Sequence, residues 1–458
     1  MIREQVLREL SDIVGPRYIL TPDNDLSEYA RDAARLSSTP DAVLFPGNSE
    51  EISRILLLAN REPFPVVPRG AGSGKCGGAV PVKGGIVLAM DRFDRILGID
   101  TQNLVAKVEP GVITAHLQEE VEKRGLFYPP DPASIKISTI GGNVATCAGG
   151  LRAVKYGVTR DYVLGLEVVL PTGEIIKTGV ETPKGVVGYD LTRLIVGSEG
   201  TLAVITSVTL RLIPKPAGKK TLVAFFADLP SVLDTVYKII RAGIVPTTLE
   251  FMDRLCMDCA GSEMGSSFPV ESQSLLLIEV DGDEALTVQV SGRVRDLCLG
   301  SGALHVESAR SEEEAERLWE ARRNISETLY VLGPDKISED IVVPRSTMAE
   351  FVSFLQTTGK RYGLPVPCFG HAGDGNIHVN ILFDEKDPKQ SEGAKRVVGE
   401  IFEKVIKMRG TISGEHGIGI TKAPYLGMEI SPPALELMVR LKRAFDPEGI
   451  LNPGKIFP

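Results

Sequence analysis

Short apolar runs and one helical pattern alternate along the first part of the chain. The helical pattern begins after Asn48, which together with Glu51 resembles a capping box. Its apolar residues recur at helical spacing and form one face, which comprises Ile52, Ile55, Leu56 and Ala59. Apolar runs predict strands at 42–45, 64–67, 163–170, 175–178 and 201–213.

The order of elements changes after residues 214–218, a segment rich in Pro and Gly that is the best domain boundary in the sequence. Beyond it, strands and helices follow the order β-α-β-β-α-β, which is typical of a ferredoxin-like arrangement. The strands are predicted at 222–226, 248–252, 275–280 and 304–307, and the helices at 231–241 and 284–297.

A further helix begins at Ser311, where Glu314 completes a capping box. Arg322 falls on its inward, apolar stripe, whereas Arg323 lies off it. An arginine on an apolar stripe requires an anion, because burying an unpaired charge is costly. A substrate carboxylate held by two hydrogen bonds and an internal Asp or Glu satisfy this requirement equally well. The other residues of the stripe are Ala315, Leu318, Trp319, Ser326 and Leu329.

Length and charge narrow the class of protein. A chain of 458 residues is too long for a single core and predicts two or three domains. The net charge of −9, without a basic cluster, argues against nucleic acid as a partner. No apolar stretch is long enough to cross a bilayer. Residues 1–10 form an amphipathic pattern that lacks the apolar core of a secretion signal, so we expect a cytoplasmic protein.

The six cysteines are scattered, which favours reduced thiols over a disulfide framework. Cys256 and Cys259 form a lone CxxC pair. These two cysteines could form a redox pair or half of a metal site. Because no second pair completes a zinc ribbon, the sequence favours a structural role.

The first glycine-rich loop, at 68–78, contains a formal GxGxxG from Gly72 to Gly77. The dinucleotide fingerprint requires a helix directly after the loop, and residues 79–85 cannot start one, which argues against a nicotinamide-binding Rossmann domain. A P-loop fails as well, because Arg69 and Cys76 stand where that motif has Gly and Ser or Thr. The remaining interpretation of residues 68–78 is a loop whose backbone amides bind phosphates.

A second glycine-rich region, at 129–150, is dense in small and hydroxyl-bearing residues. This composition suits the close approach of the backbone to a long, phosphorylated ligand. The alternative is a tightly packed glycine-rich helix and turn.

Two further glycine-rich segments, 369–380 and 413–419, contain three of the five histidines. In a strand at 377–381, His378 and Asn380 share the face opposite the apolar residues. His371, His378 and Glu415 can supply a two-histidine, one-carboxylate site for a divalent metal. His416 is then left for proton transfer. The alternative is a turn whose histidines only satisfy backbone groups.

Taken together, these segments resemble the FAD-linked oxidoreductases of the vanillyl-alcohol oxidase / p-cresol methylhydroxylase superfamily. Within it, the likeness is to the group of D-lactate dehydrogenases, D-2-hydroxyglutarate dehydrogenases and glycolate oxidase flavoprotein subunits. The resemblance implies an α+β fold with a two-part FAD-binding domain of p-cresol methylhydroxylase type and a ferredoxin-like substrate cap domain. It implies FAD binding by 1–216, a cap at 217–410, and a segment at 411–458 that returns to the FAD domain. The segments that carry the likeness are 68–78, 138–150, 370–380, 413–419 and 452–455.

The resemblance also implies cofactor contacts. Members that bind FAD covalently often have His in the first loop, where this sequence has Ser73, so we expect non-covalent FAD. The residues expected to contact FAD are Pro68, Arg69, Gly70, Ala71, Gly72, Ser73, Gly74, Gly77, Pro132, Ser138, Thr139, Gly141, Gly142, Asn143, Ala145, Gly149, Gly150 and Asn452.

The resemblance further assigns the polar site residues. In the D-2-hydroxyglutarate dehydrogenases, the positions matching His371, His378 and Glu415 bind a divalent metal, and the position matching His416 is the catalytic base. For this chain the resemblance therefore implies a divalent metal (Zn, Mn or Fe) at these residues. Arg322 matches a substrate-carboxylate arginine, and Asn380 another polar substrate contact. The region 335–340 departs from the hydroxyglutarate pattern around Lys336, which argues against the longer diacid.

The expected function is therefore FAD-dependent oxidation of a small D-2-hydroxy acid, D-lactate or glycolate, to the 2-oxo acid. Electrons would pass to an electron-transfer flavoprotein, an iron–sulfur subunit or a quinone, and such a partner could place the protein at the periphery of a membrane. The protein could also form a homodimer. The alternatives are a D-2-hydroxyglutarate dehydrogenase, an electron-transfer flavoprotein subunit with its chemistry in a partner, and a metallohydrolase, which would be colourless.

Overall fold

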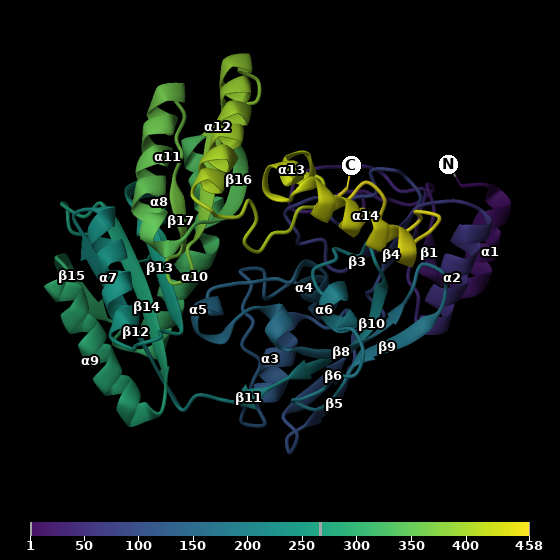
Figure 1. Ribbon diagram of the computed structural model, residues 1–458, viewed down its shortest axis with the longest axis horizontal. Coiled ribbons are helices and arrows are strands. Elements are labelled where there is room, and N and C mark those ends of the chain that lie inside the picture. Colours follow the sequence, from purple (N-terminus) through teal and green to yellow (C-terminus); the bar gives the residue numbers. More distant parts are fainter. Residues whose placement is uncertain (1, 265–267, 458) are drawn as a thin grey trace. The chain divides into compact units, whose positions relative to one another are not determined.

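A computed structural model of the chain describes residues 2–264 and 268–457 (Figure 1). The chain forms two compact units. Unit 1 comprises Met1–Gly149, Val158–Lys215 and Glu415–Pro458, and unit 2 comprises Gly150–Gly157 and Pro216–Gly414. The segment predicted as a boundary, 214–218, contains one of the crossings between the units. The sequence pattern gives no sign that the short segment Gly150–Gly157 belongs to unit 2.

Unit 1 begins with a small sheet in the order β1-β2-β4-β3, in which β2, β4 and β3 run parallel. The predicted helix is α2, and its cap is confirmed: the Asn48 side chain accepts a hydrogen bond from the Glu51 backbone at 2.8 Å. The core of this part joins one face of α2 to α1 and to the strands. The elements are α1 (Glu4–Val14), β1 (Ile19–Leu20), β2 (Ala42–Leu44), α2 (Ser49–Arg61), β3 (Val66–Arg69) and β4 (Ile86–Ala89).

The second sheet of unit 1 is antiparallel and has the order β5-β6-β10-β8-β9. The strand predicted at 201–213 is two strands, because β11 leaves β10 and pairs with β7 instead. The elements are β5 (Ile96–Asp100), β6 (Val105–Val108), α3 (Thr114–Glu122), β7 (Leu126–Phe127), α4 (Ile140–Thr146), β8 (Val163–Val169), β9 (Ile175–Gly179), α6 (Leu191–Ile195), β10 (Val204–Arg211) and β11 (Ile213–Pro214).

Unit 2 is built on a seven-stranded antiparallel sheet in the order β15-β12-β14-β13-β17-β18-β16. Its first four strands and the helices α7 and α9 reproduce the predicted ferredoxin-like arrangement (Figure 1). The strands are β12 (Gly218–Phe226), β13 (Thr248–Asp253), β14 (Ser274–Gly282), β15 (Ala303–Ser308), β16 (Asp335–Val342), β17 (Cys368–His371) and β18 (Asn376–Phe383).

The helices of unit 2 include several that the apolar pattern did not predict, among them α8, which is inserted between β13 and β14. The predicted helix after Ser311 is α10, and the Ser311 hydroxyl accepts a hydrogen bond from the Glu314 backbone at 3.2 Å. The helices are α5 (Ala153–Tyr156), α7 (Leu229–Arg241), α8 (Arg254–Met264), α9 (Glu284–Gly300), α10 (Glu312–Thr328), α11 (Met348–Tyr362) and α12 (Pro388–Lys407).

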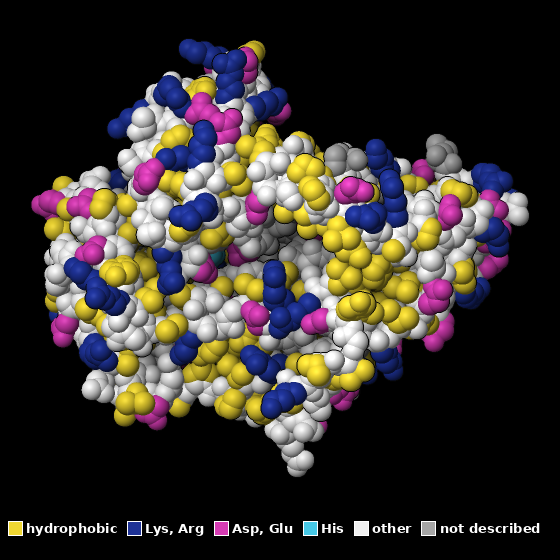
Figure 2. All heavy atoms as spheres, in the orientation of Figure 1, with side chains coloured by type: hydrophobic (Ala, Val, Ile, Leu, Met, Phe, Trp, Pro, Cys, Tyr) yellow, Lys and Arg dark blue, Asp and Glu magenta, His cyan; other side chains and the backbone are white. Residues whose placement is uncertain are grey.

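The C-terminal segment belongs to unit 1 and contains α13 (Leu426–Glu429) and α14 (Pro432–Phe445). No residue of α14 is fully buried, and Figure 2 shows hydrophobic side chains at the surface in this region. The Pro- and Gly-rich tail after 445 is not helical. It is an ordered strap, because the backbone N–H of Asn452 donates to the Val66 carbonyl of β3 at 2.8 Å. Short 3₁₀ helices lie at Pro16–Tyr18, Thr159–Asp161, Leu329–Leu332, Arg345–Thr347 and Ala423–Tyr425.

Among the helices of the described residues, none combines the length and the apolar character needed to span a lipid bilayer.

Lys455 anchors the end of the strap inside unit 1. Its ammonium group is buried and donates to the Val80 carbonyl at 2.5 Å and to Oδ1 of Asn452 at 3.2 Å. Burial lowers the pKa of Lys455 to about 8, and the neighbouring Asp32 carboxylate offsets only part of this effect. The fold therefore bears a cost for holding this group in its charged form.

Replacing Lys455 with Met should make the stability of the protein less dependent on pH. The unfolded chain keeps the proton up to the ordinary pKa of 10.5, whereas the folded chain releases it near 8. The destabilising effect of the charged form is therefore complete below the folded pKa and disappears as the pH rises toward the unfolded one. Between about pH 7.5 and 9.5, the free energy of unfolding of the wild type should rise by about 2 kcal/mol relative to Lys455→Met.

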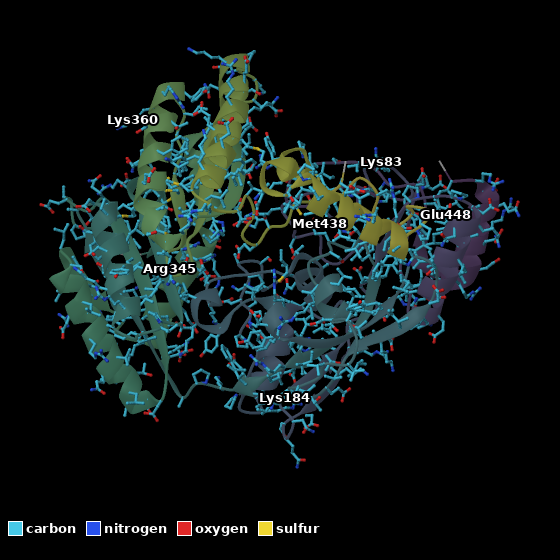
Figure 3. All side chains as sticks on the ribbon, in the orientation of Figure 1. Lys83, Lys184, Arg345, Lys360, Met438 and Glu448 are labelled. Atoms are coloured by element: carbon cyan, nitrogen blue, oxygen red, sulfur yellow. The ribbon has the colours of Figure 1, made fainter. Side chains whose placement is uncertain are left out.

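Urea denaturation at the two pH values measures this difference. The matched control is Lys83→Met at an exposed lysine of the same unit (Figure 3), which should follow the wild type at both pH values. An identical pH response of the wild type and Lys455→Met would contradict the prediction.

Candidate active site

The first glycine-rich loop follows β3 in unit 1, and no helix follows it before β4, as the sequence predicts. Gly72 has a φ of +67°, which favours glycine. The side chain of Arg69 anchors the start of the loop, because its guanidinium donates to the backbone carbonyls of Arg31 at 2.8 Å and Glu28 at 3.0 Å. Arg69 thus has a structural task in addition to its place beside the loop.

The second glycine-rich region forms α4, so the predicted alternative of a packed helix and turn is correct for 140–146. Thr139 caps the helix by accepting a hydrogen bond from the Gly142 backbone at 3.2 Å. A side chain at Gly141 would place its Cβ 2.4 Å from Cβ of Pro110. A side chain at Gly70 would place its Cβ 2.3 Å from the Thr139 hydroxyl. Gly70 therefore allows the two segments to approach each other closely, and Gly141 allows α4 to pack against Pro110.

The two segments line one cavity of unit 1, which contains about 1340 Å³ of space free of protein atoms when its open mouth is included. Its wall is largely backbone and small side chains, which suits an extended ligand with phosphate groups. The predicted FAD contacts that line it are Pro68, Arg69, Gly70, Ala71, Gly72, Ser73, Gly74, Pro132, Ser138, Thr139, Gly141, Gly142, Asn143, Ala145 and Gly149.

Three predicted FAD contacts are not among the lining residues. Gly77 packs instead, since a Cβ at this position would lie 2.9 Å from Cδ1 of Ile420. Gly150 belongs to unit 2. Asn452 joins three segments by donating to the Gly78 carbonyl at 3.0 Å and to the Glu199 carbonyl at 2.8 Å.

Glu415 and His416 line the same cavity, with Nε2 of His416 4.0 Å from Oε1 of Glu415. Gly149 makes room for Glu415, because a Cβ there would lie 2.7 Å from Oε2 of this carboxylate. The segment after His416 turns sharply at Gly417, where φ is +87°. A glycine at 417 is also required because a Cβ would lie 2.9 Å from Oε1 of Glu199.

Glu199 is a cavity residue that the sequence reasoning missed. It is buried, its two carboxylate oxygens accept hydrogen bonds from the backbone of Ile418 at 2.7 Å and Gly419 at 2.8 Å, and the Cys76 thiol donates to it at 3.6 Å. Burial raises the pKa of Glu199 despite these donors. Its only sequence signal is a place between polar Ser198 and Gly200.

In unit 2, β17 and β18 form a hairpin that carries two of the predicted metal ligands. As predicted, His378 and Asn380 alternate with apolar residues on β18, although both faces of the strand are buried. The structure brings Nε2 of His371 to 3.3 Å from Nε2 of His378. Two nitrogens that share one tetrahedral ion at about 2.0–2.1 Å are separated by roughly 3.3 Å, so this pair fits a metal-ligand role.

Asp340 on β16 organises the surroundings of His378. Its Oδ1 accepts from the side chain of Asn376 at 2.6 Å, and its Oδ2 accepts from the backbone of Gly414 at 2.9 Å. Oδ1 lies 3.9 Å from Nδ1 of His378, which is too far for a hydrogen bond. Asn380 accepts a hydrogen bond from the Ser338 hydroxyl at 2.8 Å. The hydrogen bond from Gly414 to Asp340 fixes the last residue of unit 2, which directly precedes Glu415 and His416 in the chain.

Of the two anions predicted for Arg322, a substrate carboxylate or an internal Asp or Glu, the structure shows the internal one, Glu250. Its Nε and Nη2 donate to Oε2 of Glu250 at 2.9 and 2.5 Å. The other oxygen of Glu250 lies 2.6 Å from Nδ1 of His371. Burial alone would raise the pKa of the Glu250 carboxyl, but His371 and Arg322 more than offset it and hold the pKa below its ordinary value. Direct binding of a substrate carboxylate by Arg322 stays a prediction.

Glu250, which contacts His371 and Arg322, is the second site carboxylate that the sequence reasoning missed. It lies on β13 in the segment Thr248–Asp253, where one polar residue among apolar ones looks like an outward-facing strand position. The side chain is instead completely buried.

The cysteines Cys256 and Cys368 are buried as well, and burial raises the pKa of both thiols, as a structural role implies.

Comparisons with known proteins place the chain in a family. The FAD binding domain family matches residues 40–179, and the family of FAD linked oxidases, C-terminal domain, matches residues 215–456. The glycolate oxidase subunit GlcD of Bacillus subtilis (strain 168) is 45% identical to this chain. The similarity covers 100% of this chain and 97% of that protein. A D-lactate dehydrogenase of Anaerostipes hadrus is 36% identical, with 97% of this chain covering 95% of it.

Solved structures confirm the predicted fold class. A p-cresol methylhydroxylase is similar over 99% of this chain and 96% of its own, with a TM-score of 0.82 at 17% identity. An alkyldihydroxyacetonephosphate synthase gives a TM-score of 0.77 at 19% identity, with 99% of this chain covering 85% of it. The match to the FAD binding domain contradicts the alternative of a flavin-free metallohydrolase. The chain belongs to the FAD-linked oxidases and is an FAD-linked oxidoreductase.

Proposed function

We propose that the protein oxidises a small D-2-hydroxy acid, glycolate or D-lactate, to the 2-oxo acid, and passes the electrons to a protein or quinone acceptor. The observation that carries the proposal is the buried pair of histidine nitrogens 3.3 Å apart, in a chain whose unit 1 has a cavity lined by most of the predicted FAD contacts. Full-length similarity to a glycolate oxidase subunit and to a D-lactate dehydrogenase supports it.

The cavity of unit 1 is the proposed FAD site. Gly70–Gly74 and the segment around α4 would hold the cofactor through backbone amides, without a covalent bond, because residue 73 is serine. When bound, FAD supplies the acceptor for the hydrogen that leaves C2 of the hydroxy acid.

His371 and His378 are the proposed ligands of a divalent cation (Zn, Mn or Fe). Glu415, which follows the last residue of unit 2 along the chain, is the third ligand in this proposal. When bound, the cation supplies Lewis acidity toward the hydroxyl and carboxylate of the substrate.

The remaining chemistry is assigned to side chains. His416 removes the proton of the substrate hydroxyl, and Asn380 contributes a polar contact that orients the acid. Glu199 holds the backbone that follows His416, because both of its oxygens accept hydrogen bonds from residues 418 and 419. The position of the base thus depends on a buried carboxylate in its own unit.

Lys336 bears on the size of the substrate. Its ammonium donates to the backbone carbonyl of Ser326 and to the hydroxyl of the same residue at 2.8 Å. A lysine engaged in this way is a poor clamp for the second carboxylate of a diacid. This contact favours glycolate and D-lactate, although a D-2-hydroxyglutarate dehydrogenase of Stutzerimonas stutzeri (strain A1501) is 34% identical, with 99% of this chain covering 98% of it.

The word subunit in the names of the GlcD relatives supports an assembly with other chains. We extend this to an electron-acceptor partner, an electron-transfer flavoprotein or an iron–sulfur subunit.

Anaerobic visible spectroscopy of the purified flavoprotein tests the function. Glycolate or D-lactate should bleach the flavin rapidly, and D-2-hydroxyglutarate and L-lactate should do so slowly. A flavin that none of the D-2-hydroxy acids reduces would refute the proposal and favour a subunit whose chemistry lies in a partner.

Replacing His416 with Ala should slow flavin reduction by the best substrate by about 10²–10⁴-fold, since a positioned base typically contributes that factor. Stopped-flow absorbance of the anaerobic protein measures the rate, and the spectrum before mixing shows whether flavin is retained. The matched control is His116→Ala, which removes an exposed imidazole on α3 and should leave the rate unchanged. Reduction of His416→Ala at the wild-type rate would refute the assignment.

Replacing Glu199 with Ala should loosen the segment that carries His416. The buried N–H of Gly419 and the partly buried N–H of Ile418 would lose their acceptors, at up to about 1–3 kcal/mol each. Hydrogen exchange of the amides of Ile418 and Gly419 should accelerate, and flavin reduction should slow. Glu199→Gln keeps an acceptor oxygen and should lie between Glu199→Ala and the wild type.

Glu181→Ala, at an exposed glutamate of the same unit, is the control for these measurements. Unchanged exchange at 418 and 419 in Glu199→Ala would show that the carboxylate does not hold the segment.

A further inference from the structure

The carboxylate of Glu250 lies at the centre of the unit 2 sheet. Glu250 is on β13, with β14 on one side and β17 on the other, and its direct partners in the two ladders are Leu277 and His371. Directly opposed residues of antiparallel strands project from the same face of the sheet. The register of β13 against β17 therefore places the carboxylate beside the imidazole, and no flexible segment is needed to bring them together.

Both oxygens of Glu250 are occupied, and each has a different partner. Oε1 lies 2.6 Å from Nδ1 of His371, and Oε2 accepts from Nε and Nη2 of Arg322. An ionised carboxylate only accepts hydrogen bonds, so Nδ1 of His371 must carry the hydrogen. In the neutral ring, the lone pair is then on Nε2, the atom that lies 3.3 Å from Nε2 of His378.

Arg322 prevents the carboxylate from turning away. Its guanidinium lies over the ring of Phe369, 4.5 Å from the centroid, and that ring is 5.2 Å from the ring of His378. The contacts form a closed circuit from Arg322 through Glu250, His371, His378 and Phe369 back to Arg322. Within this circuit, the hydrogen bonds of Glu250 to Arg322 and to His371 restrict the orientation of the His371 ring.

The Glu250 carboxylate supports His371 within hydrogen-bond distance. For His378, Oδ1 of Asp340 lies 3.9 Å from Nδ1, beyond hydrogen-bond distance. The close hydrogen-bonded support described here belongs to His371. A carboxylate that receives the second N–H of a metal-bound histidine orients the ring and increases its basicity.

Building on the proposed function, we infer that Glu250, locked by Arg322, is a positioning residue that holds His371 as the Nδ1–H tautomer with Nε2 presented to the cation. This assigns Arg322 an indirect task through Glu250. It also assigns a task to Glu250, which no sequence motif marked.

The test compares cation binding by the wild type and Glu250→Gln. Each holoflavoprotein is stripped with a chelator and titrated with Mn²⁺ or Zn²⁺ in a calorimeter, while its visible spectrum reports flavin content. Loss of such a partner typically weakens metal binding by about 10–100-fold, and we expect this change with full flavin content. Glu250→Gln that binds the cations as tightly as the wild type would overturn the inference.

Spectroscopy of the metal-free protein tests the tautomer directly. The chain has five histidines, so ¹⁵N-histidine labelling gives few signals, and His371→Ala identifies the one of interest. His371 should show a single Nδ1–H tautomer in the wild type and a mixture in Glu250→Gln. A wild-type His371 protonated on Nε2 would overturn the inference whatever the titration shows.

Two further variants separate positioning from stability. Asp253→Asn makes the same chemical change at another buried carboxylate of β13, which accepts hydrogen bonds from the backbone of Cys256 at 2.9 Å and Cys368 at 2.8 Å. It should lower the thermal midpoint and leave cation affinity unchanged. Glu250→Gln combined with Arg322→Met removes the unpaired charge, and should recover stability without recovering affinity.

The outcomes also distinguish this inference from the proposed function. Recovery of cation affinity in the double variant, or equal loss in Asp253→Asn, would show a purely structural role for Glu250. A wild-type protein that binds neither cation would overturn the proposed metal chemistry and the inference with it. A wild-type protein that binds a cation but is reduced by no hydroxy acid would overturn only the substrate assignment.

Discussion

The burial of one carboxylate in the middle of a seven-stranded sheet constrains much of unit 2. An anion in that environment is tolerated only when its lone pairs face donors, because the loss of hydration is not otherwise offset. Glu250 meets this condition with Arg322 from α10 and His371 from β17. The helix and the strand must therefore both be in place before β13 is satisfied. The arrangement of the paired histidines is in this way coupled to completion of the sheet.

Unit 1 solves a related problem with different donors. Glu199 is also buried, but its oxygens accept from the backbone amides of Ile418 and Gly419 and are not paired with an arginine. The amides and the nearby Lys422 do not fully offset the burial of Glu199, so its pKa is raised, whereas His371 and Arg322 more than offset the burial of Glu250 and lower its pKa. Glu250 is suited to fixing the tautomer of a neighbouring ring, whereas Glu199 is suited to holding a backbone segment.

The sequence predicted the parts of the fold that depend on local order. The spacing of apolar runs after residue 218 is sufficient for the ferredoxin-like arrangement, and the polar residues at 48 and 311 mark helix starts that the structure confirms. It predicted the strand at 377–381, which is part of β18, but not β16, β17 or their addition to the ferredoxin-like sheet, because β13 pairs with β17 and β16 pairs with β18 across long stretches of the chain. Nor could it choose the partner of Arg322, since Glu250 is 72 residues away and has the pattern of a solvent-facing position.

The candidate site shows why some functional residues are visible in a sequence and others are not. The histidines and Glu415 lie in glycine-rich segments, and those glycines are needed because side chains would collide: a Cβ at Gly149 meets Glu415, and a Cβ at Gly414 would lie 2.4 Å from Nδ2 of Asn376. Such segments are conspicuous. The carboxylates that support them carry no distinguishing signal, because Glu250 is a single acid in an ordinary strand and Glu199 lies in an ordinary turn beside Ser198 and Gly200. Geometry identifies these supports because burial requires every buried charge to have a partner.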